Sequence, residues 1–273
     1  MWYTVLMQSA SIKRIVIICA VALTATLVWA TAKPWLENPL RFSGYAILLW
    51  PSLALVLASA VAGLAWMMLD SKTDRFAAIL ASWASFVIFW SPDIWYVSML
   101  PLFALLWHLS ATRIRDDLSD RHTIRIRTSL GAGLTPLMLG TFLMLSLGFY
   151  LLPAYHNVGA SEVSVGLQGQ LTDAYDNPLV VAQLNQLPPS MRAQVKADLS
   201  KNVDAYVKRF LGPLDAYVPP LLAFALFLVL WSVLFIYREL AIWFGLLLFR
   251  GLVASGFVRI VEKDVKAETL SLV

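Results

Sequence analysis

Long apolar runs without a charged residue constrain this chain more than any other feature. Six such runs, of 15 to 26 residues, lie at 15–31, 44–69, 76–90, 94–109, 134–152 and 218–237. A helix needs about 20 apolar residues to cross the hydrocarbon core of a bilayer. With 59% apolar and 14% charged residues in 273, the chain has more apolar surface than a soluble fold can bury. The sequence therefore predicts an all-α integral membrane protein with a six-span helical bundle.

The first apolar run has two interpretations. Lys13 and Arg14 precede it, and Ala30-Thr31-Ala32 has the small-x-small form of a signal-peptidase site. We favour an uncleaved first span over a signal in residues 1–32, because the run is long for a signal and further spans follow. Cys19, the only cysteine, excludes an intramolecular disulfide and is expected to be a small buried apolar side chain.

Basic residues are divided unequally between the two sets of loops. With a cytoplasmic N-terminus, the short outer loops contain only Lys33 and Arg41. The inner segments contain ten basic residues: Lys13, Arg14, Lys72, Arg75, Arg113, Arg115, Arg121, Arg125, Arg127 and Arg238. The positive-inside rule then predicts six spans with the N-terminus in the cytoplasm. The third and fourth runs are short, so a re-entrant hairpin around 91–93 is the alternative to two spans.

This pattern divides the chain into three parts. Residues 1–152 form a first membrane half with a basic cytoplasmic loop at 110–133, residues 153–216 form an extracytoplasmic region, and residues 217–273 contain the last span and the tail. Small residues recur every four positions in the second and third runs, which predicts close helix packing in lipid. They are Ala54, Ala58 and Ala62, and Ala77, Ala81 and Ser85.

The extracytoplasmic region contains a predicted amphipathic helix. It is expected to run from a Ser190 cap to a stop at Gly212-Pro213, with Asp204 and Lys208 as an ion pair. Its apolar positions form one stripe: Met191, Val195, Leu199, Val203, Tyr206 and Phe210. An isolated helix of this length is marginal in water. The stripe is therefore expected to pack on the outer membrane face, on the rest of the region or on a second copy.

The last apolar stretch, 240–258, contains Arg250. A charge at mid-span costs roughly 3 kcal/mol, which about ten apolar residues offset, so a seventh span remains an alternative. Glu239 lies about 20° from Arg250 around a helix. This favours a helix in the plane of the inner membrane face, with Arg250 contacting headgroup phosphates or Asp116 or Asp117.

Two further features belong to the cytoplasmic face. Arg125 and Arg127 of the basic loop are candidates for the same headgroup contact as Arg250. The alternation of apolar and basic residues in "TIRIRT" (123–128) is typical of a short strand. With the strand-like "FVRIV" and "TLSLV" of the tail, it predicts a small cytoplasmic β-sheet.

Three segments resemble a known group of proteins. They are "IRIRTSLGAGLTPLMLGTFLMLSLGFYLLP", the amphipathic stretch that leads through "FLGPLDAYVPPLLAF" into a span, and the ending "GFVRIVEKDVKAETLSL". Together they resemble the multi-spanning membrane proteins of candidate-phyla bacteria, the Patescibacteria. The resemblance implies a plasma-membrane protein with an outer helical segment, and it assigns no activity.

The sequence contains little that supports an enzyme. His108, His122 and His156 have no metal-ligand spacing, and "GAGLTP" (131–136) lacks the lysine of a phosphate loop. The apolar runs contain no Asp, Glu, Lys or Arg, whereas ion-coupled transporters typically place such groups in the membrane. We therefore expect a structural or assembly protein without cofactor, metal or nucleic acid. Its partners would be the lipid bilayer and a second copy or another membrane protein. A small passive transporter or channel subunit is the alternative.

Overall fold

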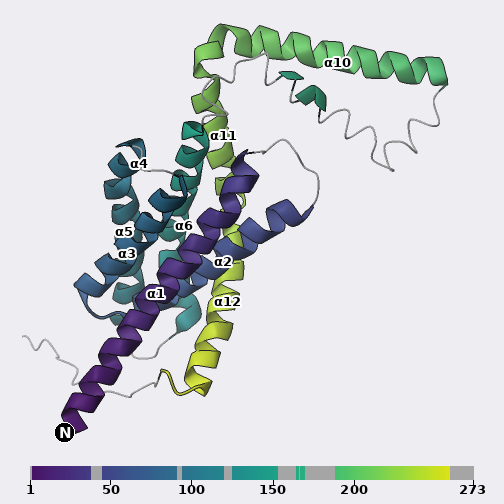
Figure 1. Ribbon diagram of the computed structural model, residues 1–273. Helices are drawn as coiled ribbons and strands as arrows, with labels where there is room; N and C mark the ends of the chain where they lie inside the picture. Colours follow the sequence, from purple (N-terminus) through teal and green to yellow (C-terminus); the bar gives the residue numbers. More distant parts are fainter. Residues whose placement is uncertain are drawn as a thin grey trace, which may run out of the picture.

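The computed structural model describes residues 2–37, 45–90, 94–119, 125–152, 164–165, 167–169 and 188–258. These residues form helices and contain no strand (Figure 1). In order, the helices are α1 (Trp2–Glu37), α2 (Tyr45–Met68), α3 (Lys72–Trp90), α4 (Ile94–Ser98), α5 (Leu100–Ser119), α6 (Ile126–Leu151), α10 (Pro189–Leu211), η1 (Gly212–Tyr217), α11 (Val218–Ser232) and α12 (Leu234–Ala254). The all-α class is therefore confirmed for the part of the chain that is described.

Several helices are long and apolar enough to cross a membrane. Four segments of the described chain have this property: Ser11–Glu37, Leu49–Met68, Ile94–Ser119 and Ile126–Leu151. The pair α11 and α12, bent by 50°, makes a fifth if it is one broken span. The 19-residue α3 is outside this set, and its first turn contains Lys72, Asp74 and Arg75. Membrane-type helices are thus confirmed, while the number of six spans stays a prediction.

The beginning of α6 differs from the sequence-based expectation. The strand predicted over 123–128 is wrong for residues 126–128, which form the first turn of α6. An alternation of apolar and basic residues over only six positions is also compatible with a helical turn. In this turn Ile126 is partly buried and Arg127 is exposed. Because α6 begins at Ile126, Pro136 lies inside the helix. The tail from residue 259, with most of the other two strand-like segments, lies outside the described residues, as does the hairpin at 91–93.

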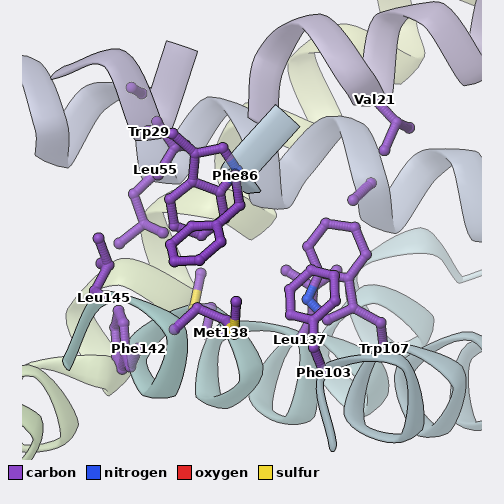
Figure 2. Packing of buried hydrophobic residues seen from close by; sticks show 14 of the residues in the cluster. Val21, Trp29, Leu55, Phe86, Phe103, Trp107, Leu137, Met138, Phe142 and Leu145 are labelled. Atoms are coloured by element: carbon purple, nitrogen blue, oxygen red, sulfur yellow. The ribbon is translucent and has the colours of Figure 1, made fainter. Parts of the chain in front are cut away.

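Aromatic side chains fill the centre of the bundle (Figure 2). The rings of Trp29 and Phe86 meet edge to face at 4.9 Å, and the Trp29 indole nitrogen donates to the Ser82 carbonyl at 3.3 Å. Trp107 contacts Phe103 at 4.6 Å and Trp66 at 6.0 Å between ring centroids. Each such pair stabilises a fold by roughly 0.5–1.5 kcal/mol beyond the contribution of the apolar area that it buries. These pairs join α1 to α3 and α2 to α5, within one buried apolar cluster.

Small residues permit the closest helix contacts, although only part of the predicted set takes part. Ala54 and Ala62 are buried, whereas Ala77 is exposed. The tightest contact joins α5 and α6, where a Cβ added to Gly133 would lie 2.6 Å from the Ser110 carbonyl oxygen. Cys19, expected to be buried, is exposed, because α1 packs on the bundle through its other side, with Val21 and Trp29 buried.

The amphipathic helix is present as α10, which lies beyond one end of the bundle and across the direction of α11 (Figure 1). Its predicted ion pair is confirmed, with Lys208 Nζ 2.8 Å from Asp204 Oδ2. The predicted cap is wrong: Pro188 is the N-cap residue, and Ser190 lies within the first turn. At Gly212 the backbone stays helical and continues into η1, which leads directly to α11.

The C-terminal helices differ most from the expectation. The sixth apolar run was predicted to end at Tyr237, but the helix breaks at Val233 and resumes as α12. Ala241, Ile242 and Gly245 are buried, and a Cβ on Gly245 would be 2.7 Å from Leu130 Cδ1 on α6. The side of α12 that carries Ala241 and Gly245 therefore packs on the bundle.

Candidate functional site

Charged side chains of several helices meet at one end of the bundle, which we call the charged end. Arg115 of α5 contacts Asp70, which follows α2, at 3.0 Å, and it donates to the Leu69 carbonyl at 3.2 Å. Arg14 of α1 lies 3.8 Å from Asp74 of α3. The part of α1 around Arg14, the turn between α2 and α3 and the last turns of α5 therefore lie together.

Near the opposite end of α1, a second lysine attaches the helix to α3. Lys33 donates through Nζ to the Phe89 carbonyl in the last turn of α3, at 3.0 Å. Lys13 and Lys33 are separated by about 30 Å along the helix at 1.5 Å per residue. This separation equals the thickness of the hydrocarbon core of a bilayer, about 30 Å. The spacing of these lysines suits a helix whose two ends reach the two membrane surfaces.

Arg127, one of the predicted headgroup contacts, lies beside α12. Its guanidinium is 3.6 Å from Glu239 and lies over the ring of Trp243 at 5.8 Å from the centroid. Arg238 contacts the other carboxylate oxygen of Glu239 at 3.1 Å. The Arg127 and Glu239 side chains are 65% and 40% exposed, so the pair contributes at most about 1 kcal/mol to stability. Together with Arg238, the group has two cations and one anion and is therefore positively charged.

Arg250 and Arg125 do not join this group. Arg250 is exposed on the side of α12 opposite Ala241 and Gly245. Among the described residues it contacts neither Asp116 nor Asp117, and Asp117 accepts a hydrogen bond from Ser129 at 2.7 Å. Arg125 is exposed at the start of α6, and its carbonyl accepts the Ser129 amide at 3.1 Å. The three predicted residues thus share surface exposure without forming one site.

The turn that follows α12 lies at the charged end. Lys13 donates through Nζ to the Phe257 carbonyl at 3.1 Å, and its ammonium lies 5.1 Å from the centre of the Phe257 ring. The pair α11 and α12 therefore runs from the α10 end of the molecule to the end that contains Lys13 (Figure 1). This is the path of one broken helix across the bundle.

Sequence reasoning missed the environment of Arg75. Arg75 is only 7% exposed, and its Nε has no hydrogen-bond partner. Burial lowers the pKa of its guanidinium, and the charge of Arg115 lowers it further, while Asp70 raises it. The only sequence feature that could have indicated a buried arginine is the position of Arg75 directly before an apolar run. That position predicts an exposed cation at the end of a span equally well.

The described residues also form an apolar cavity of about 420 Å³. It lies between α5, α6 and α11, and its walls include Leu102, Leu147, Ala223 and Phe224. No group of three or more His, Cys, Asp or Glu side chains suited to a metal ion occurs in the described ranges. His108 is exposed on α5, and the other two histidines lie outside those ranges.

Comparison of the chain with protein-family models, with curated proteins and with solved structures finds no match.

Proposed function

We propose that this chain is a multi-pass plasma-membrane protein with a structural or assembly role, which presents α10 on the outer side of the membrane. One observation carries the proposal. The apolar stripe of α10 lies open beyond the bundle, with Met191, Leu199 and Phe210 53%, 41% and 64% exposed. A helix with such a face needs a partner for stability, and contiguous exposed apolar surface is typical of an interaction site.

The membrane orientation in this proposal follows from the two ends of the bundle. The charged end contains most basic residues of the short loops, so it lies in the cytoplasm. Arg125, Arg127 and Arg250 then face the inner headgroups, where long basic side chains reach phosphates. α10 lies at the other end and is therefore outside, and the C-terminus lies on the same side as the N-terminus.

The nature of the partner follows from the two faces of α10. The stripe is apolar and aromatic, while Asp204 and Lys208 lie on the opposite face and pair with each other. Such a helix fits an apolar groove or an equal helix of a second protein. We therefore propose a second copy or another membrane protein as the partner. The described residues give no specific support to a passive channel, since aromatic rings fill the centre of the bundle.

Cross-linking along α10 tests this function. Cysteine replaces Val195 on the stripe or Lys201 on the opposite face, in a Cys19→Ala background, and intact membranes are treated with a short bis-maleimide. We expect a discrete adduct, either the dimer or a defined heterologous product, from the Val195 position and little from the Lys201 position. Equal yields at the two positions, or none at either, would contradict the proposal.

A second substitution separates assembly from folding. Leu199→Asp places a charge in the stripe and should abolish the adduct formed through Val195→Cys, while Lys201→Ala should leave it unchanged. Protein level and thermal stability in detergent should be similar for both variants, because Leu199 is exposed in the single chain. Loss of the folded monomer in Leu199→Asp would indicate an internal packing role instead.

A further inference from the structure

The side chain of Arg75 is a buried cation at the charged end. It is the fourth residue of α3, and side chains of a helix lean toward its N-terminus. The guanidinium therefore lies near the start of α3, where the charges of Asp70 and Arg115 act on it. Within the described part of the chain, no hydrogen bond or ion pair of this guanidinium is found, and its Nε is buried without an acceptor.

The two carboxylates of this cluster make no hydrogen bond to Arg75. Asp70 pairs with Arg115 at 3.0 Å, while Asp74 lies 3.8 Å from Arg14 and its buried Oδ2 has no hydrogen-bond partner. The cluster therefore contains three guanidinium groups and two carboxylates. Its net charge is positive, and Arg75 is the most deeply buried of the three arginines.

A buried charge without a counter-ion is costly for a fold. Removing the partner of a buried ion costs several kcal/mol in typical proteins, because the remaining charge is desolvated and unpaired. An uncharged residue in place of Arg75 would avoid this cost. The arrangement is therefore suited to a counter-ion that comes from outside the chain.

The local geometry selects an anion with several oxygens. The N-terminus of a helix has free amide groups and a positive dipole end, which together bind phosphate. At α3, the Ser71 hydroxyl accepts a hydrogen bond from the Thr73 amide at 3.2 Å, so one of the free amide groups of this helix terminus is already satisfied. The planar guanidinium binds phosphate through two parallel hydrogen bonds. Phosphate groups are abundant at the end of a bundle that meets lipid headgroups.

We propose that Arg75, with the N-terminal turn of α3, binds a phosphate group, either of an anionic phospholipid or of inorganic phosphate. The site is independent of the role of α10, which lies at the other end of the molecule. The bound phosphate neutralises Arg75 and thereby stabilises the junction of α2, α3 and α5.

The thermal unfolding midpoint of the full chain in an uncharged detergent measures this binding. The probes are a short-chain phosphatidylglycerol, a glycolipid with the same chains and no phosphate, and inorganic phosphate against chloride at equal ionic strength. A ligand that binds only the folded state raises the midpoint, by roughly 5 °C or more at a hundredfold excess over Kd. We expect this rise with phosphatidylglycerol or with phosphate, and the responding arm identifies the source.

Arg75→Gln is the decisive variant, and Arg113→Gln is its control. Arg113 is exposed on neighbouring α5, so the control removes the same charge from the same end. Without ligand, Arg75→Gln should unfold at the same temperature as the wild type or higher, since it removes an unpaired buried charge. With ligand, the rise should be lost in Arg75→Gln and retained in Arg113→Gln. An equal rise in Arg75→Gln, or no rise in the wild type with either phosphate source, would overturn the proposal.

A second variant covers the case in which Arg75→Gln does not fold. Arg75→Lys keeps the charge and loses the planar fork. It should raise the half-saturating concentration of the responding ligand roughly threefold or more. An unchanged half-saturating concentration in Arg75→Lys would also overturn the proposal.

Discussion

At the scale of single residues, Gly133 sets the distance between α5 and α6. The backbone carbonyl of Ser110 and the side chain of Ile114 occupy the space where a Cβ would lie. A backbone carbonyl in a packed helix has little freedom to move away, in contrast to the end of a flexible side chain. The absence of a side chain at this position therefore holds the two helices in contact.

Gly133→Ala should accordingly destabilise the fold. Overpacking of a closed contact typically costs 1–3 kcal/mol, and thermal unfolding of the purified variant in detergent measures the loss. The control is Gly251→Ala in α12, where the added Cβ meets nothing within 4 Å. This variant should be neutral or gain up to about 1 kcal/mol from helix propensity. A Gly133→Ala variant as stable as Gly251→Ala would show that α5 and α6 are farther apart.

At the scale of elements, α11 and α12 show where sequence reasoning loses precision. The apolar run before Arg238 and Glu239 predicts a helix that ends at the first charge. The chain instead breaks at Val233, and α12 carries both charges within its second turn. Arg127 of α6 lies beside Glu239 and over the ring of Trp243, both on α12, and no pattern of nearby residues indicates that contact. Helix existence was predictable here, and the position of the break was not.

The segment around Ser164 is attached to α10 through Asp204. The hydrogen bond from Lys208 and then the one from Ser164, at 2.7 Å, lower the pKa of the Asp204 carboxyl below its ordinary value of 3.8. The charged form is thus favoured in the folded state. Its contribution is fully present above the ordinary pKa and is lost as the pH falls through the lower folded value.

Spin labels at Val165→Cys and Lys201→Cys, in a Cys19→Ala background, measure this attachment by electron–electron distance. We expect a narrow distance distribution that stays constant from pH 8 to about 5 and broadens only below about pH 3.8. Asp204→Asn should give the broad distribution already at pH 7, because the amide cannot be charged. Broadening of the wild-type distribution between pH 7 and 5 would show that another group controls the contact.

At the scale of the whole molecule, composition and apolar runs predict the class of fold well. Runs such as 44–69 and 134–152 predict helices because lipid requires every backbone group to be hydrogen-bonded within its segment. The charged end was partly predictable from Lys13, Arg14 and the basic loop. The ion pairs within it and the unpaired Arg75 were not, because they depend on which helix ends meet in space.

We propose that the charged end lies in the cytoplasm and that α10 lies outside. Ser119 at the end of α5 and Ser200 in α10 mark the two ends. Each is replaced singly by cysteine in a Cys19→Ala background, and intact cells are treated with a membrane-impermeant maleimide. We expect the Ser200→Cys protein to be labelled at once and the Ser119→Cys protein to be labelled only after permeabilisation. Labelling of Ser119→Cys in intact cells as strong as that of Ser200→Cys would contradict it.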